Sequence, residues 1–227
     1  MSVYIHGGFR SPIGVLNGQY KHMRPEILGS QVIDEIINRY SISHIDGIFC
    51  GNAVGTGGNL GRLMGLMCNL PNSVPAITVD MQCASALMSI EMAYTHIVSG
   101  VMNAVIAGGI ESSSLQPERV YASGDDRKGT YKVAQFTPQN QSPLAMLEGA
   151  ERTIHKHNVT KEDLYPHIIG SHQRASAALD NPYLQSYIMP ITIDGKRCID
   201  ECIRPTMNEK LLSRMKPLLG ADSITNA

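Results

Sequence analysis

Short apolar runs alternate with segments of helical periodicity along the first half of the chain, and this alternation most constrains the fold. The strand candidates are Val3–Ile5, Asp46–Val54, Pro75–Val79 and Asn103–Gly109, and the helix candidates between them are Pro25–Tyr40, Leu60–Leu70 and Leu87–Val98. Strands that alternate with helices predict an α/β fold with helices layered on a largely parallel sheet. The third helix candidate is apolar on nearly every face, so we expect it to be deeply buried.

The composition of the sequence changes after about Glu111, where a polar stretch with little periodicity runs to Gln141. Two helix candidates follow, Ser142–Lys156 and Lys161–Leu179, and Thr160 with Asp163 gives the second a capping-box start. Beyond them we expect a strand-like segment at 188–193, a turn at 194–195 and a short helix at 211–215. The second half is therefore predicted to be a less regular region added to the α/β layer.

Composition excludes several classes of function. The 227 residues are 43% hydrophobic and 17% charged, which is typical of a globular protein with a real core, and the net charge of −1 gives no basic field for nucleic acid. No apolar run approaches the roughly 18 residues of a membrane helix, and residues 1–8 lack the features of a signal peptide. The five cysteines are odd in number and lack the spacing of a disulfide framework, which indicates a reducing compartment. We therefore expect a cytoplasmic protein without a membrane or nucleic-acid partner.

The segment Asp80-Met81-Gln82-Cys83-Ala84-Ser85-Ala86-Leu87 places a cysteine between an apolar strand candidate and an apolar helix candidate. Free backbone N–H groups at the start of a helix stabilise a thiolate, and the small residues after Cys83 leave room for a substrate carbonyl. These features suit a nucleophile that accepts an acyl group as a thioester. The alternative is a buried structural cysteine, since cysteine is among the most buried residue types.

Other motifs give weaker signals. The glycine-rich run 55–61 has the spacing G-x-G-x-x-x-G and follows the second strand candidate, so it departs from the dinucleotide fingerprint. His155 and His157 point to different faces of a helix, and Cys198 and Cys202 lack a second ligand pair at zinc spacing. We therefore expect no metal site and no nucleotide cofactor, and we expect Cys50 and Cys68, which lie in apolar runs, to belong to the core.

Six collinear segments resemble the thiolase family. The nucleophile segment 75–87 resembles its C-x-S-G motif. The other matches are Arg10–Gly14 to R-T-P-x-G, Gly57–Arg62 to G-x-N-x-x-R, Ala107–Ser112 to A-G-G-x-E-S, Met146–Glu151 to M-G-x-T-A-E, and Arg204–Thr206 with Lys216-Pro217 and Ser223–Ala227 to the approach to T-A-G-N. The resemblance implies a thiolase-like layered fold, one βαβαβαβ-type half with an inserted loop domain. It implies an α/β half at 1–113, a CoA-covering loop region at 114–216, and the start of a return to the α/β core at 217–227.

The resemblance also implies acyl-CoA thioester chemistry, with Cys83 as the nucleophile and coenzyme A entering as part of the substrate rather than as a cofactor. Met146 is implied as a pantetheine contact, and Lys216 as a contact near the phosphates at the nucleotide end. Ala86 replaces the glycine of C-x-S-G, which would cost on the order of 1 kcal/mol if that position needs a positive φ. Ala145 and Leu147-Glu148 also depart from the family pattern, which leaves the acyl-chain preference open.

The family's catalytic histidine lies in a G-H-P segment and its second cysteine in a C-x-G segment, both in a C-terminal half. No Gly-His-Pro occurs here, and Cys198 and Cys202 precede Arg204-Pro205. We therefore expect an N-terminal thiolase portion that forms an acyl-Cys83 thioester but is incomplete or inactive alone. The alternative is a non-catalytic module, or half of a split enzyme, that associates with another subunit. The resemblance further implies a role in fatty acid metabolism and a homodimer or homotetramer, and a related condensing enzyme such as a ketoacyl synthase is a further possibility.

Overall fold

The structure is a computed structural model that describes residues 2–55, 57–132, 135, 138, 142 and 144–220. Its helices are α1 (Pro25–Arg39), α2 (Leu60–Met67), α3 (Ser85–Val98), α4 (Ala145–Lys156), α5 (Lys161–Leu179), α6 (Pro182–Gln185) and α7 (Glu209–Leu212). Its strands are β1 (Gly47–Gly51), β2 (Ala76–Val79), β3 (Val105–Gly109), β4 (Arg119–Val120), β5 (Thr130–Tyr131), β6 (Thr192–Ile193) and β7 (Lys196–Arg197). The chain divides into two packing units, residues 1–132 with 187–201 and residues 133–186 with 202–227, and each is described by itself.

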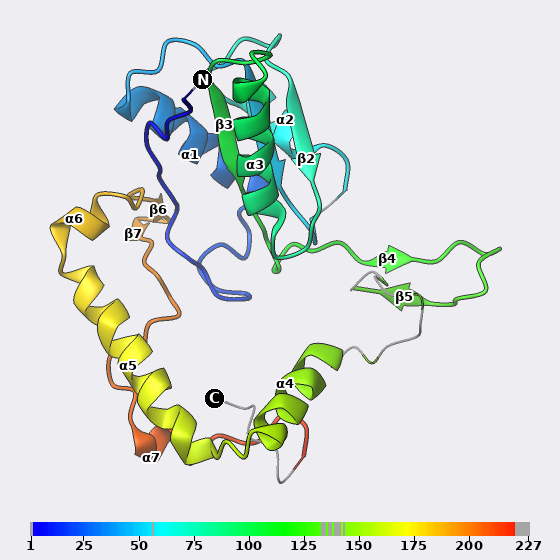
Figure 1. The fold of residues 1–227 in the computed structure, drawn as a ribbon, viewed down its shortest axis with the longest axis vertical. Helices are drawn as coiled ribbons and strands as arrows, with labels where there is room; N and C mark the ends of the chain where they lie inside the picture. Colours follow the sequence, from blue (N-terminus) through cyan, green and yellow to red (C-terminus); the bar gives the residue numbers. More distant parts are fainter. Residues whose placement is uncertain are drawn as a thin grey trace. The chain divides into compact units, whose positions relative to one another are not determined.

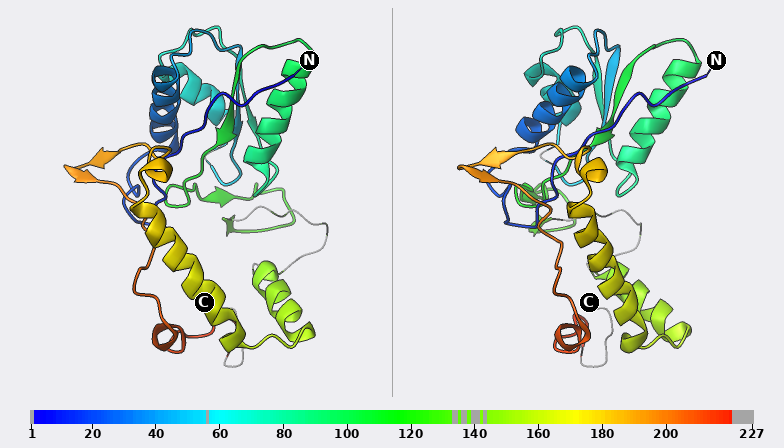
Figure 2. Two further views of the ribbon diagram at one scale, coloured as in Figure 1. Left: turned by 60° about the vertical axis from the view of Figure 1, so that its left-hand side comes forward. Right: turned by 90° about the vertical axis from the view of Figure 1, so that its left-hand side faces the viewer.

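A parallel three-stranded sheet in the order β2-β1-β3 forms the centre of the first unit (Figure 1). All five residues of β1 are buried, as expected for a central strand with both faces covered. Figure 2 shows α1 and α2 on one face of this sheet and α3 on the other. Side chains alternate between the two faces. Ile48 and Cys50 join the core with Ile33 and Met64, whereas the ring of Phe49 lies 4.9 Å from that of His96 on α3. The predicted α/β fold with helices on a parallel sheet is confirmed.

The predicted strand at Val3–Ile5 is wrong. Residues 2–9 have no regular structure, and Tyr4 and Ile5 are 83% and 89% exposed. A strand is stable only when a neighbouring strand satisfies its backbone hydrogen bonds. Among the residues that the structure describes, none pairs with this segment, so its apolar alternation alone does not make a strand.

The helix predicted at Leu87–Val98 forms as α3, but the expectation of deep burial is wrong. Ser85, Ser89 and Ala93 face the sheet and are buried. The opposite face is open, and its apolar side chains have large exposed fractions, 68% for Leu87, 46% for Ile90, 56% for Tyr94 and 41% for Val98. The helix therefore packs on the sheet through its small residues and leaves its large ones on the surface.

The segment 187–201 packs against the N-terminal segment of the same unit. The guanidinium of Arg10 makes two hydrogen bonds of 2.8 Å to the carboxylate of Asp200, and the pKa of that carboxyl is lowered by this pairing. The backbone N–H of Arg10 also donates a hydrogen bond to the carbonyl of Tyr187, and its carbonyl accepts one from the N–H of Met189. The arginine of the Arg10–Gly14 motif therefore fixes the return of the chain to the α/β unit.

The second unit is helical. Thr160 and Asp163 form the predicted capping box at the start of α5, whose bounds match the predicted range. Its core consists of Tyr165, Met207 and Leu212. The α4 helix begins at Ala145 rather than Ser142 and has no fully buried side chain. The two packing units do not correspond to the predicted functional regions 1–113, 114–216 and 217–227, and these regions stay predictions. Residues 221–227 of the last region lie outside the described residues.

Candidate active site

The strands β1, β2 and β3 are parallel, so their carboxyl ends meet at one edge of the sheet. The turn 80–84 follows β2 at this edge and leads directly into α3, which begins at Ser85. Cys83 lies in this turn, two residues before the helix. The predicted placement of the cysteine at a strand-to-helix junction is what the structure has.

The turn that carries Cys83 is left-handed at the preceding residue. Gln82 has φ = 53°, a conformation that costs a non-glycine residue on the order of 1 kcal/mol. Local hydrogen bonds hold it, because the N–H of Gln82 donates to the carboxylate of Asp80 at 2.9 Å and the N–H of Ala84 donates to the carbonyl of Met81 at 3.1 Å. The hydroxyl of Ser85 accepts from the N–H of Met81 at 2.8 Å and donates to the carbonyl of Gln82 at 2.6 Å.

Cys83 is exposed, and within the described residues its thiol makes no hydrogen bond to another side chain. Cys50, Cys68 and Cys198 are buried, as expected for the first two. Burial raises the pKa of the Cys50 thiol to about 11 and that of the Cys68 thiol to about 12, and it also raises the pKa of Cys198. Cys83 and Cys202 are therefore the two exposed thiols of the chain.

Two strand-end glycines let the first turn of α3 rest directly on the sheet. A Cβ placed on Gly51 of β1 would lie 2.5 Å from backbone atoms of Ser85 and Ala86. A Cβ on Gly109 of β3 would lie 3.0 Å from the Cβ of Ala86. No larger residue fits at Gly51 unless the helix moves. The close approach fixes the start of α3, and with it the turn that carries Cys83, at the carboxyl edge of the sheet.

The same contact settles the role of Ala86. It lies inside α3, and its methyl group faces Gly109 rather than the nucleophile side of the turn. The left-handed position of the segment is Gln82, not Ala86. The strain expected if the position of Ala86 needed a positive φ is therefore absent.

Glu111, which follows β3, organises the loop that follows β1. Its carboxylate accepts hydrogen bonds of 2.9 Å from the side-chain amide of Asn52 and from the backbone N–H groups of Ala53 and Val54. The guanidinium of Arg119 donates to the carbonyl of Gly55 at 2.8 Å. The glutamate of the Ala107–Ser112 motif thus ties two loops together at the same sheet edge.

Asn59 and Arg62, the residues of the G-x-N-x-x-R motif, attach α2 to the edge strand β2. The Asn59 side chain caps α2 by accepting from the N–H of Arg62, donates to the carbonyl of Ala76, and accepts from the hydroxyl of Thr78 at 2.8 Å. Arg62 donates to the carbonyls of Asn72 and Val74 before the strand. The motif therefore positions the strand that leads to Cys83.

The sequence patterns single out Cys83 but not Gln82, Ser85 and Gly51, which place it. They also do not reveal that Glu111 joins the loops after β1 and β3. The signal available for Ser85 and Glu111 was their place in the matched motifs. Met146 is 81% exposed in the first turn of α4, and Lys216 is exposed after α7. Both belong to the second packing unit, so their roles as CoA contacts stay predictions.

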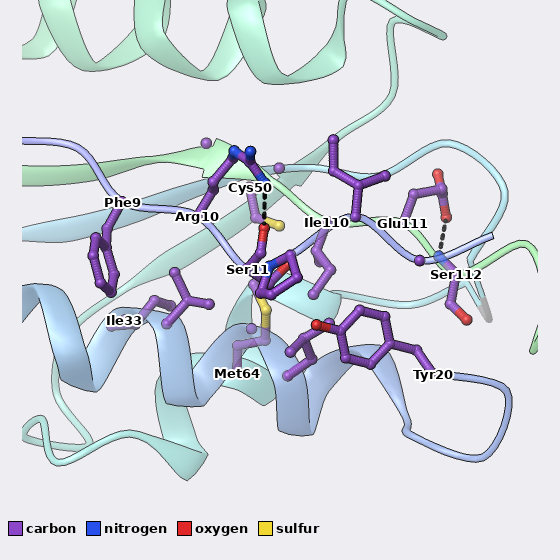
Figure 3. Close-up of a pocket in the computed structure, with 18 of the residues that line it drawn as sticks. Phe9, Arg10, Ser11, Tyr20, Ile33, Cys50, Met64, Ile110, Glu111 and Ser112 are labelled. Carbon is purple, nitrogen blue, oxygen red and sulfur yellow. Dashed lines mark hydrogen bonds between the residues drawn. The ribbon is translucent and has the colours of Figure 1, made fainter. Parts of the chain in front are cut away.

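A cavity of about 510 Å³ lies on the α1 side of the sheet, and Cys83 is not among the residues that line it. Figure 3 shows Tyr20, Ile33, Cys50, Met64 and Ile110 around it, and most of its lining comes from α1, the strands and residues 9–16. Burial, together with Cys198 and nearby carboxylates, raises the pKa of Tyr20 above its usual range. The cavity and the candidate nucleophile are separate features of the unit.

Two further kinds of feature are absent from the described residues. Within them, three or more histidine, cysteine or carboxylate side chains nowhere gather in a way that could hold a metal ion. Among the helices of that same part of the chain, none combines the length and the apolar character needed to cross a membrane.

Comparison with known proteins identifies relatives along almost the whole chain. Residues 3–227 match the family described as "Thiolase, N-terminal domain". VraB of Staphylococcus epidermidis, provisionally named an acetyl-CoA C-acetyltransferase, is 33% identical over 226 residues, which are 95% of this chain and 58% of that protein. The protein of the same name from Staphylococcus aureus is 31% identical over 225 residues, 96% of this chain and 59% of its own length. The chain thus spans just under three fifths of these curated relatives.

A solved structure shares the fold. The crystal structure of the Bacillus anthracis acetyl-CoA acetyltransferase superposes with a TM-score of 0.84 over 96% of this chain and 59% of that one. At 24% sequence identity, this similarity establishes the thiolase-like architecture of the chain.

Proposed function

This chain belongs to the thiolase family through its N-terminal domain, and we propose that it accepts an acyl group from acyl-CoA on the thiol of Cys83. One observation carries the proposal. Cys83 is an exposed thiol in the turn before α3, at the carboxyl edge of the sheet, on a helix start that Gly51 allows to lie against β1. Ligands of open α/β sheets bind at this edge.

The proposed step is a transthioesterification. The thiolate of Cys83 attacks the carbonyl carbon of the acyl-CoA thioester, and a new carbon–sulfur bond forms to Cys83. The tetrahedral adduct collapses as the bond between that carbon and the coenzyme A sulfur breaks. Coenzyme A leaves as a thiolate and takes up the proton that Cys83 released to solvent, so no oxidant, metal or further cofactor is required. Acetyl-CoA is the proposed substrate, in keeping with the names of the relatives.

Formation of a carbon–carbon bond requires more than this step. A base must remove a proton from the α-carbon of the second acyl-CoA, and it must lie within hydrogen-bond reach. Fast acylation needs a second base, one that deprotonates the thiol of Cys83, and within the described residues no base is hydrogen-bonded to that thiol. We therefore propose that this chain supplies the acyl-accepting half of a thiolase, and that both bases come from a C-terminal thiolase half.

The remaining expectations follow as proposals from the family membership. Met146 contacts the pantetheine arm, and Lys216 places its ammonium near the phosphates of coenzyme A. No cofactor is needed beyond the CoA thioester that serves as substrate. The protein acts in fatty acid metabolism in the cytoplasm.

A second candidate function is a non-catalytic thiolase-like module that associates with another subunit. The open apolar face of α3, with Leu87, Ile90, Tyr94 and Val98, favours association of some kind. Exposed contiguous apolar surface of this sort marks protein–protein contacts. A homodimer, a homotetramer or a complex with a C-terminal thiolase half would each cover it.

The test is the intact mass of the purified chain after incubation with acetyl-CoA or acetoacetyl-CoA. We expect an acyl adduct, acetyl from acetyl-CoA and acetoacetyl from acetoacetyl-CoA, that is absent from Cys83→Ser. It should be retained in Cys202→Ser, the matched control, because Cys202 is the other exposed thiol. An adduct that forms only after a C-terminal thiolase half is added would support the split enzyme. A lack of adduct under both conditions would favour the non-catalytic module, and acetylation of Cys202 or Cys198 would overturn the assignment of Cys83.

A further inference from the structure

We propose that Ser85 is a positioning residue for Cys83, because its hydroxyl clasps the left-handed turn that sets the direction of the thiol. The inference rests on the acyl transfer proposed above, and it assigns a role to a side chain that touches neither the substrate nor the sulfur.

The clasp consists of two hydrogen bonds from one hydroxyl group. The Ser85 hydroxyl accepts from the N–H of Met81 at 2.8 Å and donates to the carbonyl of Gln82 at 2.6 Å. The backbone N–H of Ser85 donates to the same carbonyl at 3.1 Å. Ser85 is only 5% exposed, so water has little access to replace these bonds. The hydroxyl therefore joins both residues before Cys83 to the first residue of α3.

The two hydrogen bonds of Ser85 support Gln82, which has an unfavourable backbone conformation. Gln82 has φ = 53°, and a long side chain with a Cβ adopts this region only where its surroundings impose it. Asp80 accepts from the N–H of Gln82, and Ser85 binds its carbonyl, so the residue is fixed on both sides. Cys83 has no side-chain hydrogen bond of its own among the described residues. The backbone of this turn therefore sets the direction of the Cα–Cβ bond that carries the thiol.

Ser85 is itself fixed relative to the sheet. A Cβ on Gly51 would lie 2.5 Å from the carbonyl carbon of Ser85, so the first turn of α3 lies in direct backbone contact with β1. The clasp connects this rigid contact to the turn. The thiol is thereby held relative to the sheet edge where acyl-CoA is proposed to bind, and displacement of a reacting atom by about 1 Å can slow a reaction by around a hundredfold.

A purely structural role for Ser85 makes a different prediction, since it would alter stability without altering the reaction at Cys83. Two reagents separate the possibilities. Acetyl-CoA reports the orientation of the thiol toward a bound substrate, whereas iodoacetamide reports only its accessibility. The buried thiols of Cys50, Cys68 and Cys198 report unfolding if iodoacetamide labels them, and the exposed Cys202 is an internal standard.

The experiment measures the rate of acetylation of Cys83 by peptide mass in the full chain and in five variants: Ser85→Ala, Gln82→Gly, the double variant, Ser89→Ala and Cys83→Ser. We expect Ser85→Ala to slow acetylation at least about tenfold, with iodoacetamide labelling of Cys83 relative to Cys202 changed by less than about twofold. Glycine adopts a positive φ without strain, so removal of the Ser85 hydroxyl in the Gln82→Gly background should cost only about threefold. Ser89→Ala is the matched control. Its hydroxyl bonds to Ala86 and Gly108, away from the turn, and we expect acetylation within about twofold.

The outcomes separate the two proposals. Acetylation of Ser85→Ala at the wild-type rate would overturn the role of Ser85 and leave the proposed acyl transfer standing. A wild-type chain whose Cys83 takes iodoacetamide but no acetyl group, both alone and with an added C-terminal thiolase half, would overturn both. If Ser85→Ala unfolds, as shown by labelling of the buried thiols, the comparison passes to Gln82→Gly with and without Ser85→Ala, and equal rates there would overturn the inference.

Discussion

Single residues without chemistry of their own determine where the candidate nucleophile lies. Gly51 removes the Cβ that would separate α3 from β1, Gln82 turns the chain, and Ser85 and Asp80 hold that turn. The thiol of Cys83 is exposed as a consequence of this arrangement. Substitutions at these positions should therefore affect Cys83 although none of them removes a reactive group.

Gly51→Ala tests the contact between helix and sheet. The new methyl group would lie 2.5 Å from backbone atoms of Ser85 and Ala86, so α3 must move. We expect the free energy of unfolding, measured by urea denaturation, to fall by about 3 kcal/mol, near the upper end of the usual cost of overpacking.

Gly108→Ala is the matched control, because a Cβ there has nothing within 4 Å. We expect a change below about 1 kcal/mol, since alanine also restricts the unfolded chain. Equal destabilisation by the two substitutions would contradict the close approach of α3 to β1.

Glu111→Ala tests the carboxylate that ties the loops after β1 and β3. The substitution leaves the N–H groups of Ala53 and Val54 and the amide of Asn52 without this acceptor. We expect a loss of about 1–2 kcal/mol in the free energy of unfolding, and a smaller loss for Glu111→Gln, whose amide oxygen still accepts. If urea denaturation gives all three proteins the same stability, the carboxylate does not hold these loops.

Sequence patterns reach some of these residues and not others. Cys83 is predictable because it lies between an apolar strand candidate and an apolar helix candidate, in a segment that resembles the C-x-S-G motif. Gln82 carries no such mark, since left-handed positions are foreseeable mainly at glycine and asparagine. The role of Gly51 depends on which strand lies under which helix, and this is a three-dimensional fact. The roles of Met146 and Lys216 as CoA contacts stay predictions.

At the scale of elements, local signals succeed where the start of a segment is marked. The α5 helix has a capping box at its start, and its bounds are those predicted. The hairpin of β4 and β5 is not predicted from the sequence, because each of its strands has only two residues. Tyr121 stacks on Tyr131 across this hairpin, with ring centres 4.4 Å apart. Val3–Ile5 failed for the opposite reason, because a good local pattern has no strand to pair with among the described residues.

The carboxylate of Asp46 connects the starts of β1 and β3, and its protonation is expected to reduce the stability of the sheet at low pH. Asp46 accepts hydrogen bonds from the N–H groups of Asn103 and Ala104 and pairs with His44. These interactions lower its pKa from 3.8 to about 2, with the bond from Asn103 as the largest cause. A depressed folded-state pKa means that the stabilisation is complete above about pH 4 and is lost as the pH falls through 2.

We therefore expect Asp46→Asn to be less stable than the wild-type chain at pH 6, and the difference between the two to shrink as the pH falls from about 4 to 2. Urea denaturation at each pH, followed by circular dichroism, measures the difference. Other carboxylates that titrate in this window act in both proteins and cancel in the comparison. A difference that stays constant down to pH 2 would show that Asp46 is not the titrating group.

At the scale of the whole molecule, the decisive feature is the face of α3 that is turned away from the sheet. Ile90, Tyr94 and Val98 recur at helical spacing on it and are 46%, 56% and 41% exposed. Exposed apolar surface of this kind is normally covered by another subunit or domain. Burial of such a stripe contributes roughly 25 cal/mol per Å² of apolar area, which favours self-association when no other partner is present.

We therefore expect the purified chain to elute from size-exclusion chromatography with a light-scattering mass above its 24.7 kDa, increasingly so as the concentration rises. The triple variant Ile90→Gln, Tyr94→Gln and Val98→Gln should shift the mass to that of the monomer. Leu184→Gln with Leu218→Gln, which removes apolar surface that is 44% and 61% exposed in the other unit, should not. A wild-type chain that remains monomeric at every concentration would mean that the α3 face needs no cover, and it would favour a self-contained module over a thiolase half.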